Sequence, residues 1–255
     1  MTEIKIWGIK INPLTKLEIV NRVDQSIKNN LSTFHLTGVN PETISQAQAN
    51  HELKNSINGS DIVNIDNSLV LLTLRMLGYR IPERAACPDI FELLLSLANT
   101  KGYSVYFLGA KEEILQNMLS KLKIKYPKLK ISGYRNGYFN NREESEIVQT
   151  ISTLKPDMLF IALPTPDKEL FISKYKKVLG VHLAFGVGGA FDVQAGKVNR
   201  APAWMRKIGL EGTHRALQDP ANYGARYIKY YIPFIKLFFR ELYKKIPNNK
   251  LHKFV

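Results

Sequence analysis

The stretch VHLAFGVGGAFD, residues 181–192, decides the fold, because it joins an apolar run to a glycine-rich loop. The run 181–185 predicts a buried strand. Three glycines within four positions predict a loop whose backbone approaches another group closely, since glycine has no side chain to prevent it. Backbone N–H groups in such loops commonly bind phosphate, and a tight turn without a ligand is an equal alternative at this spacing.

Apolar runs of strand length alternate with stretches of helical periodicity from residue 4 to about residue 190. The alternation predicts an α/β fold with a mostly parallel sheet and helices on both faces, whose ligands bind at the carboxyl ends of the strands. The expected strands are 4–11, 32–36, 61–65, 104–108, 129–134, 158–163 and 181–185. The expected helices are 15–29, 41–50, 69–77, 89–101, 112–122, 142–154 and 169–178.

The length and composition are those of a globular protein with one large domain, or with one domain and an appendage. The chain has 255 residues, of which 45% are hydrophobic. Its single cysteine, Cys87, excludes an intrachain disulfide and a C-x-x-C site, which favours a reducing compartment. We expect neither a signal peptide nor a transmembrane helix, because the N-terminus is polar and no apolar run reaches about 18 residues. A cytoplasmic protein is therefore expected.

Basic residues concentrate at the C-terminal end of the chain. The net charge is +14, and residues 204–255 contribute +8 of it, with eleven Lys and Arg against three acidic residues. Residues 227–245 mix aromatic, aliphatic and basic side chains, which predicts either a membrane-surface segment or an ordinary pair of helices docked on the core. We expect a catalytic core over residues 1–195 and a basic appendage over 196–255.

Two polar residues follow strand candidates. Asn40 precedes Pro41, a favourable first helical residue, so Asn40 is expected to cap the helix 41–50; the same loop can also hold an anion or a sugar hydroxyl. Asp66 follows the strand 61–65 and either caps the next helix or places a carboxylate over the cleft of an α/β sheet. From spacing alone, capping is the simpler interpretation of both.

Several catalytic motifs are missing from the sequence. It contains no G-x-x-x-x-G-K-[ST] phosphate loop, no G-x-S-x-G nucleophile motif, no H-E-x-x-H zinc motif and no Asp-x-Asp pair for a metal-bound nucleotide sugar. The glycine loop comes after the last predicted strand, whereas dinucleotide-binding enzymes carry theirs after an early one.

Taken in order, several stretches resemble the bacterial WecG/TagA/CpsF glycosyltransferase family, and the resemblance covers nearly the whole chain. It rests on TGVNPE (37–42), Asp66 with RIPER (80–84) and DIF (89–91), FLGA (107–110), and GVGGAFD (186–192) with Arg200-Ala201-Pro202 and GLE (209–211). The last group of motifs is the longest and most specific.

The resemblance implies a Rossmann-like core with a C-terminal appendage that contacts the membrane. It implies an inverting transfer of a sugar, typically N-acetylmannosamine from its UDP derivative, to undecaprenyl-diphosphate-linked N-acetylglucosamine for teichoic-acid-type polymers. The expected partners are a UDP-sugar donor, a lipid-diphosphate acceptor, the anionic inner face of the cell membrane and further copies of the chain. Neither a metal, another cofactor nor a nucleic acid is expected.

The same resemblance supplies candidate site residues. Asp66 matches the general base that is proposed for the family, and Thr37 belongs to the loop beside it, so both are catalytic candidates. The candidates for substrate binding are Asn40, Arg84, Gly186, Gly188, Gly189, Asp192, Arg200, Arg215 and Arg226. The chain departs from the family pattern at Asn67, Lys168, Gly212 and Asn222, where Gly, Gln, Trp and Arg are usual.

Two other functions stay open on the sequence. The net charge of +14, with tyrosines among lysines, is also typical of a nucleic-acid-binding module. The altered motifs would also suit a relative without catalytic activity that only binds the lipid intermediate. The presence of Asp66 favours an enzyme.

Overall fold

The computed structural model of the protein describes residues 3–140, 142–202, 204–205, 211, 214, 217 and 220–245, with the backbone alone for 220–223, 226 and 227. Six parallel strands form the central sheet in the order β4-β3-β8-β7-β5-β6. Their bounds are β3 Phe34–Val39, β4 Ile62–Ile65, β5 Ser104–Gly109, β6 Lys130–Arg135, β7 Met158–Ala162 and β8 Leu183–Gly186. The predicted α/β fold with a mostly parallel sheet is confirmed.

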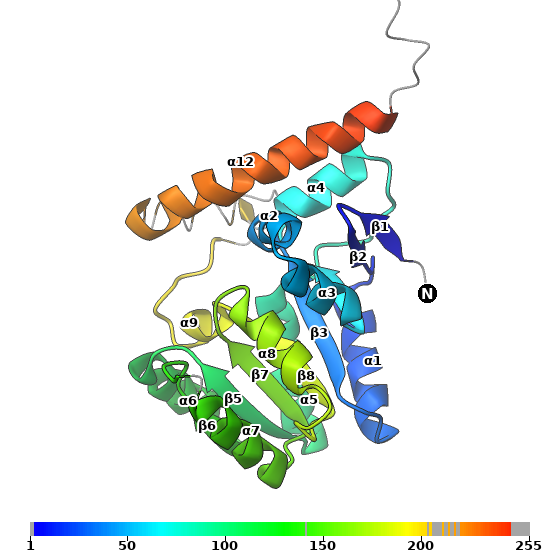
Figure 1. The fold of residues 1–255 in the computed structure, drawn as a ribbon. Helices are drawn as coiled ribbons and strands as arrows, with labels where there is room; N and C mark the ends of the chain where they lie inside the picture. The colour runs from blue at the N-terminus through cyan, green and yellow to red at the C-terminus, as the bar shows by residue number, and fades with distance from the viewer. Residues whose placement is uncertain are drawn as a thin grey trace, which may run out of the picture.

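Helices cover both faces of this sheet (Figure 1). One face carries α1 Lys16–Lys28, α5 Cys87–Lys101, α6 Glu112–Lys125 and α9 Ala190–Gln194. The other face carries α2 Pro41–Ala49, α3 His51–Gly59, α7 Glu143–Leu154 and α8 Asp167–Tyr175. The chain leaves β5 through α6 and leaves β7 through α8, on opposite faces. The junction of β5 and β7 is therefore a topological switch point, where open α/β sheets bind their ligands.

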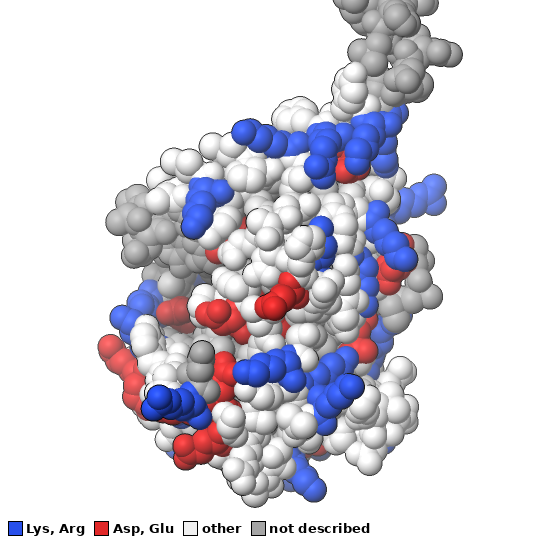
Figure 2. Space-filling model, viewed as in Figure 1, with Lys and Arg blue, Asp and Glu red and all other residues white. Residues whose placement is uncertain are grey.

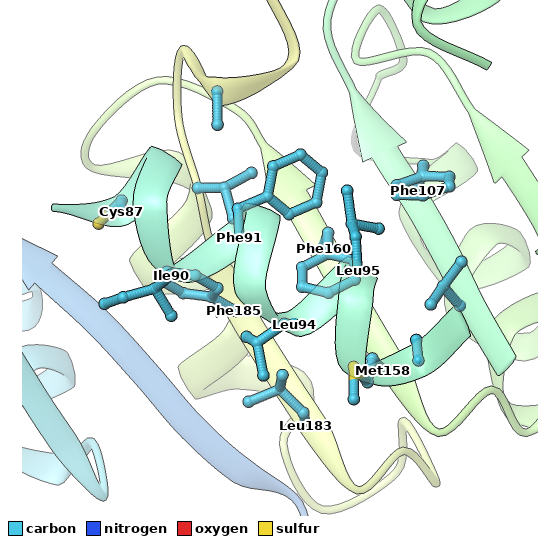
Figure 3. Packing of buried hydrophobic residues seen from close by; sticks show 14 of the residues in the cluster. Cys87, Ile90, Phe91, Leu94, Leu95, Phe107, Met158, Phe160, Leu183 and Phe185 are labelled. Atoms are coloured by element: carbon cyan, nitrogen blue, oxygen red, sulfur yellow. The ribbon is translucent and has the colours of Figure 1, made fainter. Parts of the chain in front are cut away.

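A cluster of phenylalanine rings holds the glycine loop in place. Phe91 of α5 packs edge-on against Phe160 of β7, with 4.8 Å between ring centroids, and Phe107 and Phe185 belong to the same cluster (Figure 3). Phe191, which follows the glycine loop, is fully buried and lies 5.7 Å from Phe91. A bulky ring behind the loop fixes the path of the backbone beyond β8.

The N-terminal segment differs from the prediction. Residues 4–11 form two short antiparallel strands, β1 Ile4–Ile6 and β2 Ile9–Ile11, in place of one strand. The chain turns at Trp7 and Gly8, whose φ angles are +54° and +73°. The sequence does not reveal this turn, because Trp7 is apolar and buried and therefore continues the apolar run. Helix α3 was not predicted either, since it begins directly after α2 with no loop between them.

The C-terminal helix α12, Pro220–Lys245, docks on the core next to α2. Phe234 and Phe238 are buried against the β1–β2 ribbon, and the Phe234 ring meets Trp7 edge-on at 5.2 Å. A different face of α12 stays exposed and apolar; we call it the α12 stripe, formed by Ile228, Ile232, Ile235, Phe239 and Tyr243. Docking on the core and an exposed apolar surface therefore coexist in one helix. None of the helices in the described part of the chain is long and apolar enough to cross a membrane.

Candidate active site

A cleft of about 300 Å³ lies at the carboxyl ends of β3, β4 and β8; we call it the smaller cleft. Six of the candidates named from the sequence line it together: Asn40, Asp66, Gly186, Gly188, Gly189 and Asp192. They come from three loops that are far apart in the chain. Parallel strands bring these loops to one edge of the sheet, as the sequence analysis expected.

The Asp66 carboxylate is held from one side only. Its Oδ1 accepts a hydrogen bond of 2.6 Å from the backbone N–H of Cys87, the first residue of α5. The Cys87 thiol also interacts with the Asp66 carboxylate; burial, followed by this carboxylate, raises the pKa of the thiol above its ordinary value. Asp66 does not cap the following helix, α4 Ser68–Met76, because Asn67 does so by accepting from the N–H of Leu69. Cys87 therefore orients the Asp66 carboxylate in the wall of the smaller cleft.

Asn40 combines a structural contact with a free donor. Its Oδ1 accepts from the N–H of Thr43 at 3.0 Å and thereby caps α2. Its Nδ2 amide donates to no described residue, and Asn40 lines the smaller cleft. Capping and an amide donor in the cleft are thus compatible, although the sequence presented them as alternatives.

The glycine loop supplies unpaired backbone donors. Gly188 has a φ of +52°, a conformation that favours glycine. The N–H groups of Gly188 and Gly189 make no hydrogen bond to any described residue, whereas the neighbouring Val187 N–H donates to Ile161. Both glycines line the smaller cleft, so two backbone donors lie at its rim. Such N–H groups are suited to an anion.

A buried ion pair, which the sequence analysis did not assign to the site, lies behind the same cleft. The Lys168 ammonium donates to Thr165 Oγ1 and pairs with Glu169 Oε1 at 2.6 Å. Its stem packs against Gly186, where any Cβ would lie 3.1 Å from Lys168 Cδ. Burial raises the pKa of the Glu169 carboxyl above its ordinary value, although Lys168 opposes this shift. The signal in the sequence was the replacement of the family's usual Gln by Lys.

Thr37 is not brought to the smaller cleft. Its side chain is buried, and its Oγ1 lies 3.4 Å from His35 Nε2. Ser60 Oγ lies 3.2 Å from the other nitrogen of the same ring. Burial, with a smaller contribution from Lys176, lowers the pKa of His35 to about 3. Thr37 thus belongs to a neutral hydrogen-bonded group inside the sheet, and its catalytic role stays a prediction.

Arg84 and Arg200 both form ion pairs with Glu211, and neither of them lines the smaller cleft. Arg84 Nη2 lies 2.7 Å from Glu211 Oε2, and Arg200 Nε lies 3.2 Å from Glu211 Oε1. Arg200 Nη1 also pairs with Asp89, in the first turn of α5. Burial raises the pKa of the Glu211 carboxyl, but the two arginines outweigh burial and hold it below its ordinary value. Because Arg84 and Asp89 belong to the core, the ion pairs connect the C-terminal segment to the core. Arg215 lies outside the described residues, as does the side chain of Arg226.

A larger cleft of about 1070 Å³ adjoins the smaller one at the β5–β7 switch point. Leu163, Pro164 and Asp192 line both clefts, so the two lie side by side. Tyr138, 67% exposed, presents its ring at the larger cleft, and Lys111 lies there as well. Tyr138 was not among the residues predicted from the sequence, although its position three residues after β6 was a usable signal.

This arrangement defines a class of protein. An oriented carboxylate faces unpaired N–H donors across a small cleft, and a second cleft of nucleotide size opens beside it. Such an arrangement is suited to group transfer on a phosphate-bearing substrate, with the carboxylate as a candidate general base. The chain belongs to the glycosyl transferase WecG/TagA/CpsF family, whose model matches residues 4–248, and is thus a glycosyltransferase.

Relatives of known activity support the same class. A protein of Bacillus subtilis (strain 168) is 34% identical over 198 residues, which cover 78% of this chain and 75% of the relative. A protein of Bacillus spizizenii (strain ATCC 23059 / NRRL B-14472 / W23) is 30% identical over 223 residues, 84% of this chain and 86% of the relative. A protein of Staphylococcus aureus (strain MW2) is 25% identical over 218 residues, 85% of each chain. All three are named N-acetylglucosaminyldiphosphoundecaprenol N-acetyl-beta-D-mannosaminyltransferase.

Proposed function

We propose that this glycosyltransferase moves N-acetylmannosamine from UDP-N-acetylmannosamine to N-acetylglucosaminyl-diphosphoundecaprenol, with inversion, for a teichoic-acid-type polymer. The names of the relatives supply the acceptor and the transferred sugar. The observation that carries the proposal is the oriented Asp66 carboxylate, with Oδ1 held by Cys87 and the glycine loop lining the same cleft.

The proposed reaction is a single displacement in the smaller cleft. The acceptor hydroxyl oxygen attacks the anomeric carbon, and Asp66 Oδ2 takes the hydroxyl proton as the new bond forms. The bond from the anomeric carbon to the diphosphate oxygen breaks, and its electron pair leaves with UDP. The N–H groups of Gly188 and Gly189 would donate to the diphosphate as its charge develops. The Asn40 amide is placed to bind a sugar hydroxyl or the diphosphate.

The larger cleft would hold the nucleoside of the donor. It lies at the switch point of the sheet and shares Leu163 and Pro164 with the smaller cleft. The exposed Tyr138 ring offers a face on which a planar base can stack. The sugar would then extend from this cleft toward Asp66.

The α12 stripe would place the enzyme on the inner face of the membrane as a peripheral protein. Lys and Arg side chains gather along the C-terminal half of α12 (Figure 2), and Lys236, Arg240 and Lys244 are exposed there. Apolar side chains beside cations suit an anionic lipid surface, and the proposed acceptor is itself a lipid. The Asn67 amide donates to the Tyr231 hydroxyl at 3.4 Å, so α12 also lies close to the catalytic loop.

The proposal is tested by measuring UDP release from a panel of UDP-sugars, with a short-chain lipid-diphosphate-N-acetylglucosamine acceptor and EDTA. We expect acceptor-dependent release with UDP-N-acetylmannosamine, and at least tenfold less with its C2 epimer, UDP-N-acetylglucosamine. A lipid diphosphate without the sugar is the matched control acceptor. No release from any donor, or release that does not depend on the acceptor, would contradict the proposal.

A further inference from the structure

Lys168 is the one cation that lines the smaller cleft within the described part of the chain. The other charged residues of that lining are Asp66 and Asp192, both acidic. A diphosphate that entered the cleft would therefore meet two carboxylates and a single ammonium group. The attraction that offsets this repulsion has to come from Lys168 or from outside the described lining.

Two of the four arginines expected to bind substrate already have carboxylate partners. Arg84 and Arg200 both pair with Glu211, and Arg200 pairs with Asp89 as well. The remaining Nη2 of Arg200 is enclosed by protein, without a hydrogen-bond partner and without contact with solvent. Neither guanidinium lines the smaller cleft.

The ammonium group of Lys168 has one N–H donor more than it has described protein acceptors. An ammonium group has three N–H donors. Thr165 Oγ1 and Glu169 Oε1 accept two of them, and no other described residue accepts the third. The side chain of Lys168 is only 10% exposed, and its stem packs against Gly186, the first residue of the glycine loop.

We propose that Lys168 binds the β-phosphate of the leaving nucleoside diphosphate together with the N–H groups of Gly188 and Gly189. This inference rests on the proposed function and adds the residue that stabilises the leaving group. When the bond from the anomeric carbon to the diphosphate oxygen breaks, its electron pair stays on that oxygen, and the acceptor's proton moves to Asp66. Lys168 keeps its proton throughout and acts by charge and hydrogen bonding alone.

The test compares binding of UDP and of UMP, which lacks the β-phosphate, by isothermal titration calorimetry. Lys168→Gln removes the charge and leaves the Glu169 carboxylate buried without its cation. Lys168→Gln/Glu169→Gln removes both charges, so no unpaired carboxylate remains. Lys176→Gln is the matched control, because Lys176 pairs with Asp61 and lines neither cleft.

We expect both Lys168 variants to bind UDP about 10- to 100-fold more weakly and to bind UMP with less than a threefold change. The Lys176→Gln control should bind both nucleotides as the wild type does. If both variants keep the wild-type preference for UDP over UMP, Lys168 is only a structural partner of Glu169, and the donor site stands without it. If only the double variant keeps the preference for UDP over UMP, the weaker binding by Lys168→Gln comes from the unpaired Glu169 carboxylate, and Lys168 is again only a structural partner. A wild-type protein that binds no UDP would overturn both this inference and the proposed function.

Discussion

Lys168 is a buried cation in the first turn of α8, and Arg200 is a half-buried cation paired with the first turn of α5, yet their surroundings differ. Lys168 has two protein acceptors and lies in the wall of the smaller cleft. Arg200 has carboxylates of two residues, Asp89 and Glu211, and lies outside that wall. A cation whose unused donor lies at a cleft can bind a ligand, whereas a cation whose unused donor is enclosed by protein joins segments of the chain. The comparison separates the charges that act on substrate from those that attach the C-terminal segment.

The largest effect is expected when the attached segment is removed. Truncation after residue 195 deletes Arg200, Glu211 and α12 but retains every residue that lines the smaller cleft. We expect the core to fold with a lower Tm, because the surface beneath Phe234 and Phe238 becomes exposed. Transfer to the lipid acceptor should fall about 100-fold or more, since the acceptor is no longer positioned.

Activity assays and UDP titrations of the truncated protein check this prediction. UDP affinity should change less than tenfold, because the core keeps the whole described lining of the smaller cleft and all of the larger cleft's lining except Lys197. Truncation after residue 245 retains α12 and is the control. Full transfer activity without residues 196–255 would show that the appendage does not complete the active site.

The α12 stripe is expected to have the next largest effect. The double variant Ile232→Ser/Phe239→Ser removes two exposed apolar side chains and leaves Phe234 and Phe238 in place. Binding to vesicles with anionic lipid should weaken about 30-fold, since each apolar side chain that inserts contributes about 1–2 kcal/mol. Vesicle sedimentation at low and high salt measures this.

Ile124→Ser is the matched control for the stripe, because Ile124 is highly exposed on α6, remote from α12. It should leave vesicle binding unchanged. Activity with a short, water-soluble acceptor should be retained in the double variant. Unchanged vesicle binding by the double variant would assign the α12 stripe a role other than membrane contact.

A smaller effect is expected at the ion pairs of the C-terminal segment. Glu211→Gln removes the carboxylate shared by Arg84 and Arg200, whose side chains are mostly buried. We expect the free energy of unfolding to fall by about 2 kcal/mol, with less than a twofold change in KM for the donor. Urea unfolding and steady-state kinetics measure the two quantities.

Glu92→Gln is the control, because the Lys125–Glu92 pair is solvent-exposed and should contribute about 0.5 kcal/mol or less. A tenfold rise in KM for Glu211→Gln with an unchanged free energy of unfolding would show that Arg84 and Arg200 act in substrate binding. That result would remove the distinction between cleft cations and attachment cations.

Much of the fold was predictable because its signals are local. Apolar periodicity placed the six strands of the sheet, and Asn40-Pro41 marked the start of α2. The ion pair of Arg84 with Glu211 was not predictable, since 127 residues separate its partners. The position of Lys168 in the cleft wall depends on how α8 packs beside β8, which no local pattern records. The turn at Trp7 was missed because its side chain is buried in the core.

The smallest predicted effect concerns the neutral group inside the sheet. Burial depresses the pKa of His35 to about 3, with a contribution from Lys176, whereas the unfolded chain binds a proton near the ordinary value of about 6.5. The unfolded state therefore binds more protons between these values. The stability from neutral His35 is fully present above pH 6.5 and is lost as the pH falls toward 3, by at most about 1.4 kcal/mol per pH unit.

Urea unfolding at pH 7, 6 and 5 checks this prediction with the wild type and His35→Gln. The difference in unfolding free energy between the two proteins should shrink as the pH falls. His182→Gln is the control, because His182 lies near the surface, at a single backbone contact. A difference that stays constant across this pH range would show that His35 is not depressed in the folded state.

The central claim is that Asp66 acts as the general base, whereas other residues of the cleft bind the donor. Turnover and UDP affinity of Asp66→Asn, measured side by side, test it most directly, because an asparagine oxygen can still accept from the Cys87 N–H. We expect kcat to fall by about 10³ while the Kd for UDP changes less than threefold. Asp24→Asn, which removes a carboxylate bonded to Tyr103 and Lys28, should leave both unchanged. A kcat for Asp66→Asn within tenfold of the wild-type value would contradict the account and assign the base to another residue.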